Sequence, residues 1–125
     1  MMWQALFWLY LANAVLLITH EIDSAYWKEW ELFGLPGGLS GFLALHLPLL
    51  AGILYGLVLV HERSLAGLVI SLVLSAGGLF AFLIHSFFLH RGRPEFRAPA
   101  SIAILASILL ASVLEGAAAV VLLVA

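Results

Sequence analysis

Three histidines of this chain, His20, His46 and His85, lie within or at the end of long apolar segments. A neutral imidazole is a common ligand of transition metals, and carboxylates complete many such sites. Asp23 follows His20 by three positions, so on a helix the two side chains share one side and could chelate one ion. We therefore predict a metal site, holding Zn or Fe, with His20, Asp23, His46 and His85 as its ligands.

Two further groups of polar residues would turn such a site into an enzyme. On a helix, Glu21 points about 100° away from His20, and we assign it as a general base or as a partner that orients a metal ligand. Arg91, Arg93 and Arg97 stand close together in the sequence, and their guanidinium groups could bind a phosphate or carboxylate. The pattern favours a metal-dependent hydrolase or oxygenase that acts on a lipid-phase or anionic-headgroup substrate.

The elements that position these residues are expected to be membrane helices. The chain has 125 residues, 65% of them hydrophobic and only 10% charged, whereas a soluble domain averages about 45–50% and about 25%. This composition, with five Lys and Arg and no Cys, excludes an ordinary soluble domain, a nucleic-acid-binding protein and any cysteine-ligated site. We predict an all-α bundle of four transmembrane helices, forming a single domain over residues 1–125, with spans at 3–19, 39–60, 65–89 and 98–124.

The first span has two alternative ends. Residues 20–33 contain neither Gly nor Pro, so the helix either continues to residue 33 or bends and lies in the membrane interface. In both cases the Gly34-Leu35-Pro36-Gly37-Gly38 run is expected to end it. Within this segment the charged stretch Lys28-Glu29-Trp30-Glu31 is interpreted as a solvated helix surface without chemistry.

The three histidines are expected at one depth in the membrane. In a four-span chain, the end of the first span, the start of the second and the end of the third meet at one surface, which supports a shared site. The loops at that surface, 20–38 and 90–97, carry four Lys and Arg residues, whereas the turn at 61–64 carries only Arg63. The positive-inside rule then places both longer loops in the cytoplasm and both termini outside.

Other functions remain open for the same residues. Two of the histidines could ligate haem b axially, with the arginines near its propionates. Without catalysis, the chain would be an accessory subunit, a lipid-binding protein or a small transporter. Asn13 and Glu115 would then form an interhelical clamp or a proton relay. Small residues at four-residue spacing would pack the helices together, or pack them against a second copy or a larger membrane complex.

Several stretches carry a family resemblance: THEIDSAYWKEWE at residues 19–31, LPGG at 35–38 and HLP at 46–48. In them the chain resembles a family of small, uncharacterised bacterial membrane proteins with four spans and a His-Glu-x-Asp stretch at the end of the first helix. The resemblance covers under half of the chain. It implies a bacterial cytoplasmic (inner) membrane and membrane lipids as surroundings, and it implies no particular mechanism.

Overall fold

The computed structural model describes all 125 residues and contains helices without strands. Four of its five helices are long and apolar enough to cross a membrane. This confirms the predicted all-α architecture with four spanning helices. The bounds of the helices are α1 Met2–Tyr26, α2 Glu29–Leu32, α3 Gly38–His61, α4 Leu65–His90 and α5 Pro99–Val124.

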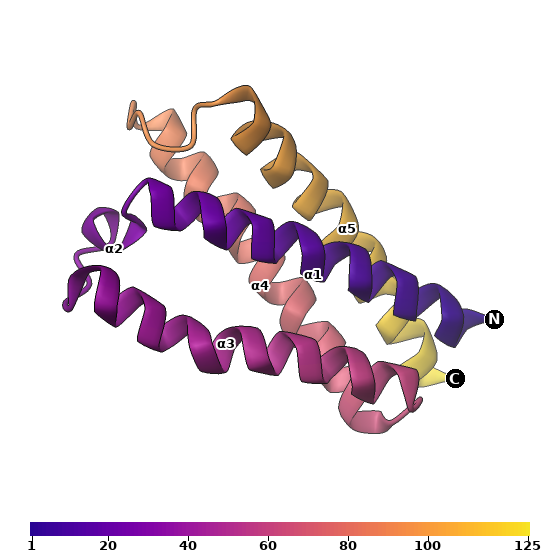
Figure 1. Ribbon diagram of the computed structural model, residues 1–125. Helices are drawn as coiled ribbons and strands as arrows, with labels where there is room; N and C mark the ends of the chain where they lie inside the picture. The colour runs from indigo at the N-terminus through magenta and orange to yellow at the C-terminus, as the bar shows by residue number, and fades with distance from the viewer.

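The four long helices form an up-and-down bundle (Figure 1). α1 contacts all three of the other long helices, and α4 contacts α3 and α5, whereas α3 and α5 do not touch each other. Both termini and the α3–α4 turn lie at one end of the bundle. The loop that carries α2 and the loop between α4 and α5 lie together at the opposite end. The topology therefore brings the end of α1, the start of α3 and the end of α4 to one place.

Local chemistry sets several of the helix ends. The hydroxyl of Ser64 accepts a hydrogen bond from the Gly67 amide at 3.0 Å and so caps the first turn of α4. Pro99 begins α5, where a missing amide hydrogen costs nothing. α3 runs as one helix through Pro48, which cannot donate a hydrogen bond to the carbonyl one turn earlier.

The first helix ends at Tyr26, which corrects the expectation that the glycine run at 34–38 ends it. Lys28 adopts the left-handed conformation with φ 52°, and the backbone reverses there. α2 then folds back across the end of the bundle, so Glu29 reaches both α1 and α4. Neither alternative for residues 20–33 holds in full, because α1 passes residue 19 but stops well before residue 33.

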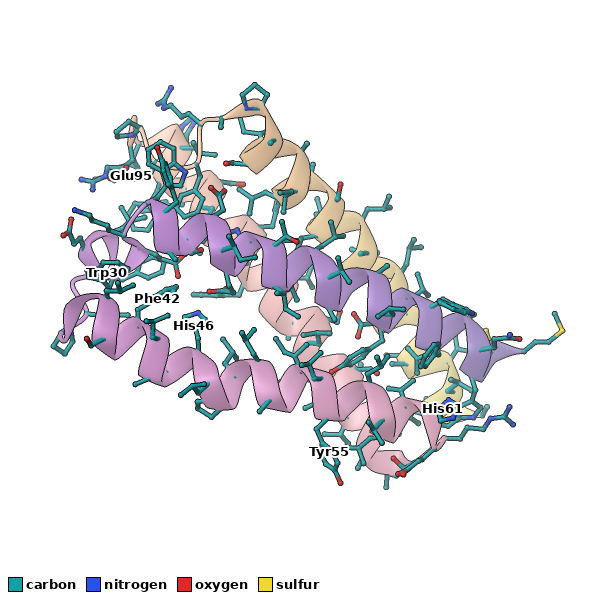
Figure 2. All side chains as sticks on the ribbon, in the orientation of Figure 1. Trp30, Phe42, His46, Tyr55, His61 and Glu95 are labelled. Carbon is teal, nitrogen blue, oxygen red and sulfur yellow. The ribbon has the colours of Figure 1, made fainter.

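Apolar side chains lie on both the inside and the outside of the bundle (Figure 2). Inside, Leu6, Tyr10 and Ile108 are fully buried. Outside, large apolar residues such as Leu47 and Tyr55 are 74% and 62% exposed. A soluble domain rarely exposes apolar patches of this extent, whereas a lipid-facing helix surface requires them.

Candidate metal centre

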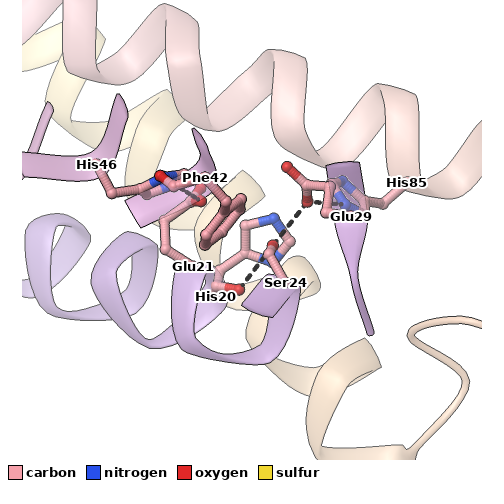
Figure 3. A network of polar contacts seen from close by, with 7 residues as sticks. All are labelled: His20, Glu21, Ser24, Glu29, Phe42, His46 and His85. Atoms are coloured by element: carbon pink, nitrogen blue, oxygen red, sulfur yellow. Dashed lines mark hydrogen bonds and ion pairs between the residues drawn. The ribbon is translucent and has the colours of Figure 1, made fainter. Parts of the chain in front are cut away.

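His85 is held in one orientation by two contacts. Its Nδ1 atom lies 2.8 Å from the carbonyl oxygen of Ala81, one turn earlier on α4. A carbonyl oxygen only accepts hydrogen bonds, so Nδ1 must carry the hydrogen. The other ring nitrogen, Nε2, lies 3.0 Å from Oε2 of Glu29 (Figure 3). His85 therefore directs Nε2 at a carboxylate, and its side chain is only 3% exposed.

Glu29 lies on the short helix α2, and its carboxylate is hydrogen-bonded to a serine of α1. The Ser24 hydroxyl lies 2.6 Å from Glu29 Oε2 and 2.9 Å from the His20 carbonyl oxygen. Burial of Glu29 raises its pKa, but hydrogen bonds from His85 and Ser24, together with positive charge on the neighbouring His85 and His20 rings, outweigh burial and hold the pKa below its usual value. Because the folded-state pKa is the lower one, these contacts stabilise the fold at neutral pH. That contribution is lost as the pH falls through the lowered pKa.

His20 completes the cluster from α1. His20 is only 1% exposed, and its ring contacts the ring of His85 edge to face, with the ring centroids 4.5 Å apart. Its Nδ1 atom is buried and has no hydrogen-bond partner. Buried polar atoms of this kind are uncommon in native proteins, and an ion is one of the few explanations for them.

His20, Glu29 and His85 can each direct one ligand atom to a common point, since these atoms lie within 4.8 Å of one another. Two His and one Glu form the ligand set of one class of catalytic zinc site. Two His and one carboxylate also form the facial triad of non-haem iron oxygenases. The donor set therefore fits the metals expected from the sequence, although one ligand, Glu29, differs from the predicted set.

His46 and Glu21 form a second His–Glu pair beside the cluster. His46 Nδ1 lies 2.7 Å from the Phe42 carbonyl oxygen, and Nε2 lies 2.5 Å from Glu21 Oε2. The Phe42 ring stacks on the imidazole at 3.8 Å between centroids. Of the four predicted ligands, the structure thus groups His20 with His85. It pairs His46 with Glu21, and it leaves Asp23 half-buried outside the group.

A cavity of about 440 Å³ begins at this site and extends into the membrane-spanning part of the bundle. His20, Glu21, Glu29 and His85 line its polar end. The rest of its wall is mainly apolar and comes from α1, α3 and α4. The cluster therefore borders a space large enough for a small molecule.

The three arginines predicted to bind substrate lie on the surface and do not line the cavity. Arg93 forms a salt bridge with Glu95 at 2.9 Å. Arg97 donates to the Arg93 carbonyl oxygen at 2.9 Å, and the Arg91 guanidinium lies 5.4 Å from the centroid of the Phe87 ring. Their loop is nevertheless at the same end of the bundle as the cluster.

The predicted intramembrane polar residues Asn13 and Glu115 lie deeper in the bundle. The Asn13 amide donates to Glu115 Oε2 at 2.6 Å and to the Ser112 hydroxyl at 3.1 Å. All three residues are fully buried, and Glu115 Oε1 has no partner. This group joins α1 to α5 and does not line the cavity.

Comparison with known proteins places the chain in a family. A family model described as "Family of unknown function (DUF6713)" matches residues 6–122, which is nearly the whole chain. The chain belongs to DUF6713. No curated protein and no solved structure matches it. The family assignment agrees with the expectation of a family without an assigned activity, so the function of this DUF6713 member must be inferred from its site.

Two residues of the candidate site are not predicted from the sequence. Glu29 was interpreted as part of a solvated surface, because nothing in the sequence marks Lys28 as a point of reversal. Phe96 lies in the loop between α4 and α5, has φ 66° and is only 1% exposed. Its ring packs against His20 and His85, with centroids at 5.6 and 4.3 Å. A single aromatic residue in a charged loop gives no signal of that role.

Proposed function

We propose that the protein binds one divalent transition metal ion, zinc or iron, through His20, Glu29 and His85. The observation that carries this proposal is the His20–Glu29–His85 group, whose ligand atoms lie within 4.8 Å of one another and in which the buried His20 Nδ1 has no hydrogen-bond partner. Leaving such an atom unsatisfied costs about 1–3 kcal/mol. A bound cation would satisfy His20 and would also neutralise Glu29.

The orientation of His85 supports the same conclusion. Its Nδ1–H is already donated to the Ala81 carbonyl oxygen, as is typical of metal-ligating histidines. Nε2 and the Glu29 carboxylate then face each other as two acceptors, which is unfavourable unless a proton or a cation lies between them. A metal ion would replace that proton, so binding should release protons to the solvent.

We further propose that the metal serves an enzyme, a hydrolase or oxygenase that acts on a lipid-phase substrate. Three protein ligands leave coordination positions open, and such a metal can activate water or another oxygen ligand. Glu21 lines the same cavity and would act as a general base, with His46 hydrogen-bonded to it. Arg91, Arg93 and Arg97 would attract an anionic headgroup from the rim.

The wall of the cavity favours this enzyme over a proton transporter. A transporter would need a polar path from His46 past Asn13 to Glu115. Beyond its polar end the cavity is lined mainly by apolar residues such as Leu17, Ile53 and Leu74, and neither Asn13 nor Glu115 lines it. Apolar walls of this kind suit a hydrocarbon ligand and do not conduct protons.

We propose that the membrane is a bacterial cytoplasmic membrane and that the metal site lies at its cytoplasmic face. The resemblance noted above and the four cations at that end support this orientation. The chain has no Cys, so single Glu62→Cys and Pro94→Cys variants can be labelled in intact cells with an impermeant maleimide. We expect Glu62→Cys to react and Pro94→Cys to be protected, and the reverse pattern would overturn the orientation.

Elemental analysis of the detergent-purified protein tests the metal site. We expect close to one equivalent of zinc or iron, lost in a His20→Ala, His85→Ala double variant. His61→Ala and His90→Ala are matched controls, because both histidines are exposed and lie outside the cluster. Asp23→Asn should keep the metal if Glu29 is the third ligand. A wild-type protein that binds neither metal after reconstitution, or a double variant that still binds it, would refute the proposal.

A further inference from the structure

The cavity beside the metal site has its mouth on the lipid-facing surface. Three residues of its wall, Leu49 of α3 with Val73 and Phe80 of α4, are 44%, 59% and 63% exposed. The wall residues Leu17 and His20 of α1 are buried. The opening therefore lies between α3 and α4, two helices that the 62–64 turn joins at the far end and that diverge toward the end carrying α2 (Figure 1).

The cavity is long as well as apolar. Its wall on α4 runs from Ile70 to His85, a separation of about 22 Å at 1.5 Å per residue. That length is well over half of a bilayer core of about 30 Å. A hydrocarbon chain matches both the length and the apolar lining of the cavity. A compact, water-soluble substrate matches neither.

Two glycines keep the space open. Gly52 of α3 and Gly77 of α4 both line the cavity, and a Cβ atom added at either position would meet nothing within 4 Å. Other glycines of the same helices are in tight contact, such as Gly67, where an added Cβ would lie 2.6 Å from the Leu59 carbonyl oxygen. The absence of side chains at 52 and 77 therefore serves the cavity and not helix packing.

We propose that the cavity binds a single hydrocarbon chain of a membrane amphiphile, which enters between α3 and α4 and lies with its polar end at His20, Glu29 and His85. This inference deepens the proposed function and rests on it for the role of the polar end. It names the substrate class as lipids that have a single chain or that insert one chain into the cavity. The orientation follows from the wall, which is polar at the His85 end and apolar at Ile70.

Photocrosslinking with two long-chain fatty acids tests the proposal. One probe carries a diazirine near the carboxyl group and the other carries it near the methyl end. The protein is reconstituted in phosphatidylcholine vesicles, and labelled residues are mapped by mass spectrometry. We expect the methyl-end probe to label Leu17, Ile53 and Leu74, which are buried in the bundle and line the cavity. The carboxyl-end probe should label Phe33, Ile84 or His85.

Cavity-filling variants provide matched controls. Gly52→Leu and Gly77→Leu place a side chain in the cavity, while Ala51→Leu and Ala76→Leu add the same bulk at neighbouring exposed positions outside it. We expect the glycine variants to reduce labelling of Leu17, Ile53 and Leu74 about tenfold, or about 1.4 kcal/mol of binding. The alanine variants should label as the wild type does.

The outcomes separate this proposal from the metal site. Three results would overturn chain binding. They are labelling confined to exposed residues, methyl-end labelling at the polar end with carboxyl-end labelling at the apolar end, and equal labelling of Gly52→Leu and Ala51→Leu. Metal retained in the glycine variants would show that the metal site survives such a failure. Chain binding can also be tested without the metal, in chelator-treated protein and in the His85→Ala variant. If the methyl-end probe still labels Leu17, Ile53 and Leu74 there, chain binding is supported even though no metal is bound.

Discussion

Glu29 and His85 are 56 residues apart in the chain, and their side chains meet with Oε2 and Nε2 at 3.0 Å. The contact exists because the backbone reverses at Lys28 and returns α2 to the end of the bundle. It joins a loop helix to the end of α4 and supplies the one carboxylate of the His20–Glu29–His85 group. The loop is therefore part of the site and not merely a connection between spans.

Replacing Glu29 by Gln should weaken metal binding strongly. The amide can still accept a hydrogen bond from Ser24, so the loop should keep its position, but the anionic ligand is lost. Since even partners that only orient a metal ligand contribute about 10–100-fold in affinity, we expect at least that loss here. Titration against a chromophoric chelator measures it. Glu31→Gln, at an exposed position of the same short helix, should bind as the wild type does, and equal effects of the two changes would contradict the assignment of Glu29.

Phe96 should control how fast the metal exchanges. Its buried ring covers His20 and His85 from the loop side, so Phe96→Ala should open a path for chelators and speed metal removal several-fold. Removing a buried Phe also costs about 3–5 kcal/mol of stability, so Phe96→Leu, which retains apolar bulk, should fold and exchange at close to the wild-type rate. Phe87→Ala, at a position 50% exposed, is the control. Unchanged exchange in folded Phe96→Ala protein would refute the covering role.

The sequence predicted the fold well because four long apolar runs permit only membrane helices. The depth of each residue in the membrane follows from its position along its helix. That depth was enough to predict that His20 and His85 lie at the same level. Depth does not fix which side chains pair at that height, so His46 was grouped with the ligands although it contacts Glu21. Glu29 and Phe96 depend on left-handed backbone at Lys28 and at Phe96 itself, at φ 52° and 66°. Neither residue type favours that conformation, so the sequence pattern does not predict it.

Gly67→Ala should destabilise the bundle, while Gly77→Ala on the same helix should not. At position 67 the new Cβ would lie 2.6 Å from the backbone carbonyl oxygen of Leu59, which cannot move without shifting α3. Overpacking of this kind costs about 1–3 kcal/mol. At position 77 nothing lies within 4 Å, and alanine is the better helix former by about 1 kcal/mol. Reversible unfolding in mixed micelles compares the two, and equal stability would refute the close contact between α3 and α4.

Asn13 and Glu115 should be energetically coupled across the α1–α5 interface. The amide donates to the carboxyl oxygen at 2.6 Å, and both residues are fully buried. Interhelical hydrogen bonds in membranes contribute about 0.6 kcal/mol on average and about 1.7 at most. A double-mutant cycle with Asn13→Ala and Glu115→Ala should therefore give a coupling free energy near the upper end of that range.

Glu115→Gln distinguishes a clamp from a site that needs the carboxyl group. A glutamine carbonyl can accept the same hydrogen bond from Asn13, so Glu115→Gln should retain most of the stability that Glu115→Ala loses. Metal content should be unchanged in both variants, because Glu115 lies outside the His20–Glu29–His85 group. Coupling near zero in the double-mutant cycle would contradict the clamp. Loss of metal in Glu115→Gln would instead link this buried pair to the metal centre.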